Sequence, residues 1–264
     1  MKEITSINNE TIKQTVKLHQ KKYRNGSHLF IIEGIKGLEE AIKSNVEVKD
    51  IFTSNQKFLK NNILPQNKMY IVTEQIMKKL STTESPPEII AVAKQKEHSI
   101  KDILKNQIPL ILVFENIKDA GNLGTIVRSA AAFDCSGIIL LGDTVDIYNP
   151  KTVRASAGNL WKIPVIIYKN EISSLKEEIN SIKKCNFIAT NVEKQNKTKY
   201  IQDYNFKNPA VIIFGSEAEG ISKESLHICN ASITIPMKDN VESLNLSISA
   251  GLVLYESFRQ RLHV

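Results

Sequence analysis

The chain has 264 residues, of which 42% are hydrophobic and 24% charged, a composition typical of a globular protein with a sizeable core. Its N-terminus is polar and no apolar run approaches the ~18 residues of a membrane span, so we expect no signal peptide, no membrane partner and a cytoplasmic location. The net charge is +7, and residues 1–106 carry 18 Lys and Arg against 12 Asp and Glu. This basic N-terminal excess favours a polyanionic partner, although many lysine-rich proteins are simply basic. Three widely spaced Cys predict reduced thiols rather than disulfides or a metal site.

Helices and strands alternate along residues 1–95, as in a small α/β domain. Apolar residues at helical spacing predict a first helix over residues 10–24. The later elements are expected in this order: strand 28–34, helix 35–44, strand 48–54, helical turn 56–62, strand 68–73, helix 74–83 and strand 86–95. Residues 96–107 are polar and lack a sustained pattern, and we expect them to be a linker.

Residues 108–264 are predicted to form a second, larger α/β domain. Its strand runs are nearly continuous in Val, Ile and Leu, which is typical of a mainly parallel sheet with helices on both faces. Strands are expected at 109–117, 137–142, 163–168, 186–191, 209–215 and 231–237. Helices are expected from about Thr125 to Phe133, over 173–184 and 223–229, and from Leu246 to Arg261. Ligands bind at the carboxyl ends of such strands, and three of these ends are unusual.

The first unusual strand end carries the sequence DAGNLGTIVRS. It has neither the G-x-G-x-x-G spacing of a dinucleotide-binding turn nor the Gly-Lys-Ser/Thr of a phosphate-binding loop. It offers an amide at Asn122 and a guanidinium at Arg128, which we expect near the N-terminus of a helix. A cation there opposes the helix dipole, so an anionic ligand would stabilise it. On these residues alone, an ordinary strand–turn–helix connection is the alternative.

The other two strand ends are polar and lead into helices. In FGSEAEG, Gly215 lets the backbone approach a ligand closely, and Glu217 either caps a helix or binds a hydroxyl or cation. In IPMKDNVESLNLS, Ser243 and Asn245 stand where a helix N-cap is expected, and together they also make a small hydrogen-bonding site. Each segment alone is equally compatible with a capped helix start.

In this order, N-x-G-x-x-x-R, F-G-x-E-x-x-G and I-P-M followed by S-L-N-x-S closely resemble the three motifs of the SpoU (TrmH) family of RNA ribose 2′-O-methyltransferases, within the SPOUT superfamily. The resemblance covers residues 108–260. It implies a C-terminal domain with a trefoil knot over about residues 210–250 and a homodimer formed through that domain. Residues 1–95, through FIIEGIKGLEEAI, more loosely resemble the ribosomal-protein-like RNA substrate-binding domain often joined to it.

The resemblance also implies a cofactor and site residues. S-adenosylmethionine is expected against Thr190, Gly215, Ile235, Met237, Leu244 and Leu246. The positions that match the family's catalytic residues are Asn122, Arg128, Glu217, Ser243 and Asn245. Arg128 is expected to hold the phosphate beside the target ribose, because a guanidinium stays protonated at neutral pH and is a poor base. We expect no metal, because the positive charge of the sulfonium already activates the methyl group.

Four basic residues, Lys21, Lys22, Arg24 and Arg154, are expected to contact RNA; a solvated helix end and a plain surface arginine are the alternatives. We therefore predict 2′-O-methylation of an RNA ribose, with large-subunit ribosomal RNA as substrate because a separate domain suits a large folded RNA. The alternatives are a transfer-RNA methyltransferase, a non-catalytic RNA-binding or ribosome-assembly protein, and an unrelated Rossmann-type enzyme. The sequence identifies neither the target nucleotide nor whether the role is housekeeping or antibiotic resistance.

Overall fold

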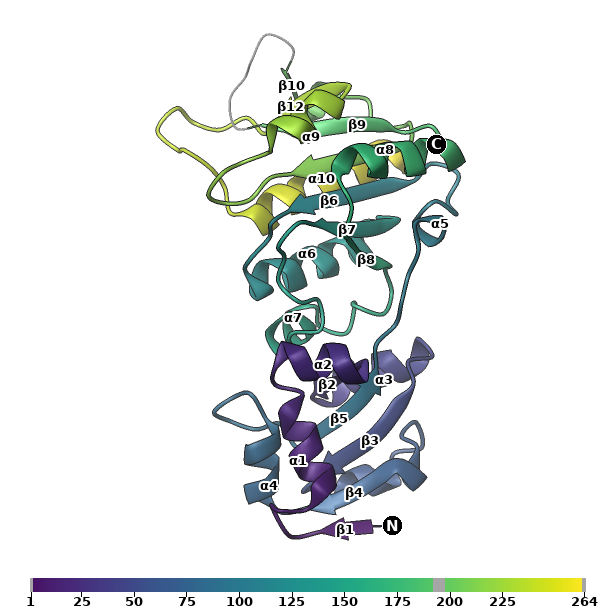
Figure 1. The fold of residues 1–264 in the computed structure, drawn as a ribbon, viewed down its shortest axis with the longest axis vertical. Coiled ribbons are helices and arrows are strands. Elements are labelled where there is room, and N and C mark those ends of the chain that lie inside the picture. The colour runs from purple at the N-terminus through teal and green to yellow at the C-terminus, as the bar shows by residue number, and fades with distance from the viewer. Residues whose placement is uncertain (1, 192–197, 263–264) are drawn as a thin grey trace. The chain divides into compact units, whose positions relative to one another are not determined.

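The computed structural model describes residues 2–191 and 198–262, which fold into two compact units (Figure 1). Unit 1 is Met1–Lys96 with Asp146–Lys162, and unit 2 is Glu97–Val145 with Ile163–Val264. The chain therefore passes between the units three times. This division differs from the expected domains, because residues 146–162 group with the N-terminal residues and not with the rest of 108–264.

Unit 1 is built on a five-stranded sheet in the order β1-β4-β3-β5-β2. β4 pairs in parallel with β1 and β3, whereas β5 is antiparallel to β2 and β3. Two helices, α1 and α4, cover one face of the sheet. Their side chains Ile12 and Ile76 are buried in the same apolar core as Phe52 of the sheet. These elements are β1 (Lys2–Ile4), β2 (Leu29–Glu33), β3 (Val48–Thr53), β4 (Met69–Val72), β5 (Ile89–Lys94), α1 (Glu10–Lys17) and α4 (Glu74–Leu80).

The opposite face of this sheet carries α3 (Ile35–Lys43) and α7 (Pro150–Ala155), which both contact β2. The segment that contains α7 also places the rings of Tyr148 and Trp161 against Phe30 of β2, with centroids 4.7 and 5.3 Å apart. Phe30 is fully buried. Residues 146–162 thus complete the core of unit 1.

Two predicted details of unit 1 differ from the structure. The helix expected over residues 10–24 is interrupted at residues 18–20, so that α2 (Lys21–Ser27) follows α1 as a separate helix. The single helical turn expected between β3 and β4 is a pair of 3-10 helices, η1 (Gln56–Lys60) and η2 (Gln66–Lys68).

Unit 2 is built on a seven-stranded, all-parallel sheet in the order β10-β12-β9-β11-β6-β7-β8. Every residue of β6, β7 and β11 is buried, which confirms the predicted α/β fold with a parallel sheet covered on both faces. The strands are β6 (Leu110–Glu115), β7 (Gly137–Leu141), β8 (Val165–Tyr168), β9 (Asn186–Thr190), β10 (Thr198–Tyr200), β11 (Ala210–Phe214) and β12 (Ala231–Thr234).

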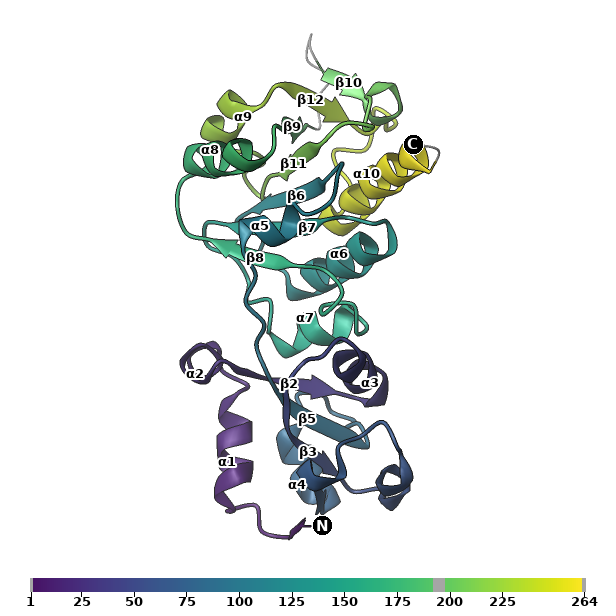
Figure 2. The same cartoon turned by 90° about the vertical axis from the view of Figure 1, so that its right-hand side faces the viewer.

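Helices α6 (Ala120–Ala132) and α10 (Leu246–Arg261) lie on one face of the unit 2 sheet, and α8 (Ile172–Ile182) and α9 (Lys223–Ile228) lie on the other (Figure 2). A 3-10 helix, η3 (Ile201–Asp203), follows β10. The bounds of α10 are those predicted from the sequence. No helix among the described residues is long and apolar enough to cross a membrane.

The expected linker at 96–107 contains a short helix, α5 (Ile100–Ile103). Ser99 and Asp102 form its capping box, and Ile100, Ile103 and Leu104 are buried in the core of unit 2 beside α8. These residues are therefore part of unit 2. The sequence did not predict this helix, because the three buried apolar residues are flanked by polar ones.

Helix α6 begins five residues earlier than predicted, at Ala120 instead of Thr125. The Asp119 carboxylate accepts a hydrogen bond from the backbone N–H of Asn122 at 2.7 Å and caps the helix. Gly121 and Gly124, both among the first five residues of the helix, have low helix propensity and hid this start. Arg128 consequently lies in the middle of the 13-residue helix, so the predicted opposition between its charge and the helix N-terminus is wrong.

Candidate active site

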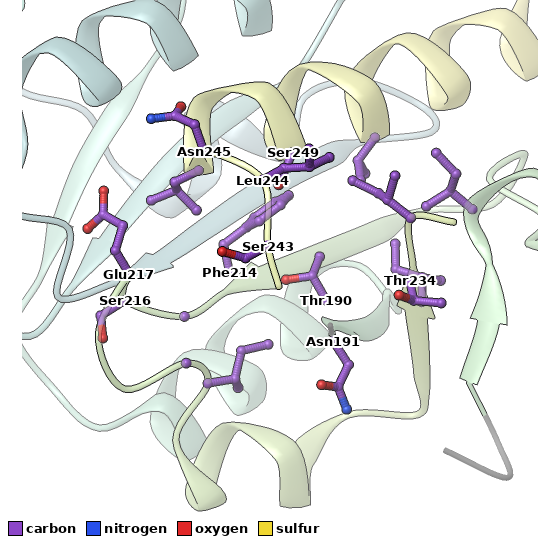
Figure 3. A pocket seen from close by; sticks show the side chains of 18 of the residues that line it. Thr190, Asn191, Phe214, Ser216, Glu217, Thr234, Ser243, Leu244, Asn245 and Ser249 are labelled. Carbon is purple, nitrogen blue, oxygen red and sulfur yellow. The ribbon is translucent and has the colours of Figure 1, made fainter. Parts of the chain in front are cut away.

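A cavity of about 570 Å³ opens at the carboxyl ends of β9, β11 and β12, beside the start of α10 (Figure 3). Its volume is within the range of cofactor sites in enzymes. The cavity is lined by all six residues that were expected to hold the cofactor: Thr190, Gly215, Ile235, Met237, Leu244 and Leu246. The Thr190 hydroxyl donates to the carbonyl of Ile213 at 3.0 Å, which ties the end of β9 to β11.

One wall of the cavity is a loop of residues 215–221, which follows β11. Within this loop, Ser216 and Gly220 pair through two backbone hydrogen bonds of 3.1 and 3.0 Å. Gly215 packs so closely on this pair that a Cβ built there would lie 2.0 Å from the carbonyl carbon of Gly220. The loop is therefore tightly closed, and the exposed Glu217 lies near its tip.

The facing wall is the segment that leads into α10. Asn245 is the N-cap of this helix: its side-chain oxygen Oδ1 accepts from the backbone N–H of Ser247 at 2.9 Å and from the Ser247 hydroxyl at 2.6 Å. This confirms Asn245 as one of the two predicted caps. Ser243 lines the cavity two residues earlier. Because Oδ1 of Asn245 is occupied by Ser247, the amide nitrogen of Asn245 points away from the helix.

Three of the predicted catalytic side chains meet at the edge of the cavity. The amide nitrogen of Asn245 donates to Oδ1 of Asn122 at 3.1 Å, and the amide nitrogen of Asn122 donates to Oε1 of Glu217 at 2.7 Å. Figure 3 shows Glu217 and Asn245 on the same side of the cavity, Glu217 from the loop after β11 and Asn245 from the start of α10. These hydrogen bonds fix the orientation of the Asn245 and Asn122 amides, and the last acceptor is the carboxylate of Glu217.

Arg128 is not part of this cluster. It is six residues after Asn122 on the same helix, and six steps of about 100° place the two side chains roughly 120° apart around the axis. Arg128 is exposed, and it does not line the cavity. Of the five predicted catalytic residues, Arg128 therefore stands apart from the cavity and from the cluster at its edge.

The walls of the cavity are mostly apolar, and their charge is negative. Among the described residues that line it, only Glu217 and Glu219 are charged. Nucleotides that carry several phosphates are bound by cations and by open helix N-termini. The described lining of the cavity contains neither lysine nor arginine, so it suits a neutral or cationic ligand with an apolar body better than a dinucleotide, which argues against the Rossmann-type alternative.

In unit 1, the predicted RNA contact at Arg24 is wrong. Arg24 is 2% exposed, and its Nε and Nη2 atoms lie 2.7 and 2.6 Å from Oδ2 of Asp146. Its Nη1 atom donates to the carbonyls of Leu18 and His19, both at 2.8 Å. The guanidinium is used inside unit 1 to hold the turn between α1 and α2, and it cannot reach an external phosphate.

The neighbours of Arg24 lie on the surface. Lys21 and Lys22 are exposed on α2, as is Tyr23, whose ring has the Nζ of Lys22 at 4.8 Å from its centroid. The Nζ of Lys17 approaches the same ring from α1, at 5.8 Å. Sequence reasoning missed this aromatic side chain, although its position between basic residues was a readable signal.

Arg154 has a partner inside unit 1. One of its terminal nitrogens lies 2.6 Å from Oε2 of Glu33 and also donates to the hydroxyl of Thr82. The Glu33 side chain is 2% exposed, whereas that of Arg154 is 33% exposed. Glu33 also accepts from the backbone N–H of Thr82 at 2.7 Å, so the pair anchors the loop after α4. An RNA contact by the exposed part of Arg154 stays a prediction.

Comparisons with known proteins agree with the motifs. Residues 109–255 match the model of the SpoU rRNA Methylase family, and residues 9–91 match that of the MRM3-like substrate binding domain. An uncharacterized tRNA/rRNA methyltransferase of Synechocystis sp. is 32% identical, covering 98% of this chain and 94% of its own length. The Bacillus subtilis 23S rRNA (guanosine(2553)-2′-O)-methyltransferase RlmP is 29% identical, covering 97% and 98%. The crystal structure of an AdoMet-bound rRNA methyltransferase from Sinorhizobium meliloti superimposes with a TM-score of 0.87 at 27% identity, covering 99% and 98%.

Proposed function

This chain belongs to the SpoU rRNA methylase family, and we propose that it methylates the 2′-oxygen of a ribose in large-subunit ribosomal RNA with S-adenosylmethionine as donor. The observation that carries the proposal is the meeting of Asn122, Glu217 and Asn245, from three distant segments, at the edge of one cavity. The Bacillus subtilis relative, which is named for a 23S rRNA substrate and has nearly the same extent, supports the choice of RNA.

The cavity fits S-adenosylmethionine in size and in charge. Apolar side chains such as Leu244 and Leu246 would pack against the adenine, and backbone groups at the ends of β9, β11 and β12 would supply hydrogen bonds. The carboxylates of Glu217 and Glu219 would balance the positive charge of the ligand. When bound, the cofactor supplies a methyl group that the sulfonium charge has already activated.

The residues of the site then have to orient a hydroxyl and the groups around it. We assign Asn122 and Asn245 to this task, because each is held in one orientation by its hydrogen bonds. Glu217 keeps one carboxylate oxygen engaged with Asn122, which leaves the other to accept a hydrogen bond from a bound group. Ser243, on the same wall, would contact the nucleotide or the cofactor.

Arg128 is assigned to the RNA. Its exposure and its distance around α6 from Asn122 favour a contact with a phosphate outside the cavity, beside the target ribose. A guanidinium stays protonated at neutral pH, so it stabilises developing negative charge and does not act as a base. Arg128 would therefore position the nucleotide and lower the energy of the forming alkoxide.

Methyl transfer is assigned to unit 2, and RNA binding to unit 1 together with Arg128 of unit 2. The exposed Lys21 and Lys22 would provide phosphate contacts, and Tyr23, the next residue, offers a surface on which an unpaired base stacks. The match of residues 9–91 to a substrate binding domain supports this division. Arg154 would add a contact through its exposed part.

A homodimer formed through unit 2 is also part of the proposal. Helix α10 exposes Ile248, Leu252 and Tyr255 at 53%, 38% and 53%, which follow one another at i, i+4 and i+7 along one stripe. An exposed apolar stripe of this kind indicates a partner surface. The trefoil knot over about residues 210–250 and a cytoplasmic location belong to the same proposal; the match of residues 109–255 to the SpoU family supports the knot.

The test is transfer of radiolabelled methyl groups to RNA. Wild type, Arg128→Ala and Arg128→Lys would be incubated with labelled S-adenosylmethionine and RNA from cells that lack the enzyme, both as free RNA and as intact subunits. We expect label in large ribosomal RNA, loss of label with alanine and only partial recovery with lysine, because lysine keeps the charge but not the planar fork. Label in small RNA would favour a transfer-RNA substrate, and no label at all would favour a non-catalytic RNA-binding protein.

A further inference from the structure

Glu115, the last residue of β6, is a buried carboxylate outside the cluster described above. It is 6% exposed, and its hydrogen-bond partners are neutral. Oε2 accepts from the backbone N–H of Ser222 at 2.9 Å, and Oε1 accepts from the hydroxyls of Ser222 and Ser225, both at 2.7 Å. A buried carboxylate is costly unless it is well hydrogen-bonded, and these three hydrogen bonds offset that cost.

The two partners of Glu115, Ser222 and Ser225, follow the loop of residues 215–221 in the sequence. Ser222 is the next residue after the loop and the N-cap of α9, where its hydroxyl accepts from the backbone N–H of Ser225 at 3.1 Å. Ser225 is fully buried. Glu115 thus ties the far end of the loop to β6.

The near end of the loop is fixed to the same strand. β11 pairs with β6 so that Phe214 is opposite Phe114, and their rings stack with centroids 5.0 Å apart. Two consecutive residues of β6 therefore hold the two ends of the loop, Phe114 through Phe214 and Glu115 through Ser222. Between these anchors the loop is closed on itself by the contact of Gly215 with Gly220.

We infer that Glu115 is a positioning residue: through Ser222 and Ser225 it holds the loop of residues 215–221 as a rigid wall of the cofactor cavity, with Glu217 in reach of Asn122. The inference rests on the proposed function for the meaning of that cavity. Glu115 itself lines no part of it. Its role would be to keep the wall in place before the ligand arrives, so that binding does not have to order the loop.

The first test is Glu115→Gln, with Glu256→Gln as the matched control. Glutamine has nearly the same shape, but its NH₂ group cannot accept a hydrogen bond, so part of the set from Ser222 and Ser225 is lost. Glu256 is a second buried carboxylate of unit 2, 8% exposed, and its partners Arg259 and Gln260 lie in the last turns of α10. Both variants remove one buried charge, and only one of them touches the loop.

The first readout does not need the cofactor. A protease that cleaves after glutamate would be added to the native protein, and cleavage after Glu217 and Glu219 would be followed by mass spectrometry. We expect faster cleavage there in Glu115→Gln but not in Glu256→Gln. Cleavage at the wild-type rate in a folded Glu115→Gln protein overturns the inference.

The second readout is calorimetric binding of S-adenosylhomocysteine, a stable analogue of the cofactor. We expect Kd to rise about tenfold in Glu115→Gln, the size of effect of losing one hydrogen bond to a charged group, and to stay unchanged in Glu256→Gln. If wild type binds no analogue while the cleavage result holds, the proposed function fails and the positioning role stands. Should Glu115→Gln not fold, Ser225→Ala removes a single bond of the set and is expected to change both readouts in the same direction; no change in either overturns the inference.

Discussion

A single methyl group at Gly215 tests whether the loop of residues 215–221 must keep its shape for methyl transfer. A Cβ there would lie 2.0 Å from the carbonyl carbon of Gly220, 2.1 Å from its oxygen and 2.2 Å from the nitrogen of Ile221, where ordinary contacts begin at 3.4 Å. All three atoms are backbone, so none can move aside as a flexible side chain would. In Gly215→Ala, the backbone at residues 220 and 221 must retreat by about 1 Å or more.

The retreat moves Glu217, which lies between the two contacting glycines and accepts a hydrogen bond of 2.7 Å from Asn122. A misplacement of about 1 Å in a catalytic group typically costs about 10²-fold in rate. We therefore expect kcat/KM for methyl transfer to fall about 10²-fold and the free energy of unfolding to fall by about 1–3 kcal/mol. RNA binding, measured by filter retention, should stay at the wild-type level, because the proposed RNA contacts Lys21, Lys22 and Arg128 are not part of this loop.

Gly251→Ala is the matched control. A Cβ at Gly251 of α10 would have as its nearest neighbour the Ser129 hydroxyl at 4.0 Å, so alanine fits there and should stabilise the helix by about 0.5–1 kcal/mol. If folded Gly215→Ala methylates RNA as fast as wild type and Gly251→Ala, the reasoning that ties the shape of the loop to catalysis is refuted.

Three further predictions follow from buried or exposed groups. Arg24→Met leaves the Asp146 carboxylate buried without its cation, so urea denaturation followed by the fluorescence of the single tryptophan should show a loss of about 3–5 kcal/mol; a change below about 1 kcal/mol would contradict the structural role. Tyr255→Asp places a charge in the exposed stripe of α10 and should turn a dimer into a monomer in light scattering. Burial raises the pKa of the Cys135 thiol to about 12, so it stays protonated from pH 7 to pH 9, and maleimide labelling detected by mass spectrometry should require unfolding at either pH.

The parallel sheet of unit 2 could be predicted because its signal is local. Strands such as β6 and β11 consist almost wholly of apolar residues, and the requirement that both faces be covered follows from that alone. The composition of unit 1 could not be predicted in the same way. Residues 146–162 carry a capped helix in their sequence, with Asn149 before Pro150, but nothing local says which sheet Tyr148 and Trp161 pack against.

The site shows the same division between local and distant information. Asn122, Glu217 and Asn245 could be brought together by reasoning, because parallel strands present their carboxyl ends at one edge. The burial of Arg24 depends on Asp146, which is 122 residues away in the sequence, and a basic run on a short helix otherwise looks like a surface. The position of Arg128 along α6 depends on where the helix begins. Because the predicted start was five residues too late, Arg128 was expected near the helix N-terminus, whereas it lies in the middle of the helix.

The distribution of charge separates recognition of the cofactor from recognition of the RNA. The described lining of the cavity has two carboxylates and no cation, whereas Lys21, Lys22 and Arg128 are exposed elsewhere. Binding to phosphates releases counterions from the RNA, so its strength falls steeply with salt, while binding in a small, largely apolar cavity responds little. Raising the salt concentration from about 50 to about 200 mM should therefore raise KM for RNA about tenfold for every two phosphates that the protein neutralises, and leave the Kd of S-adenosylhomocysteine within about twofold. Equal salt dependence of the two constants would mean that a cation outside the cavity also holds the cofactor, and the separation argued from the charges would not stand.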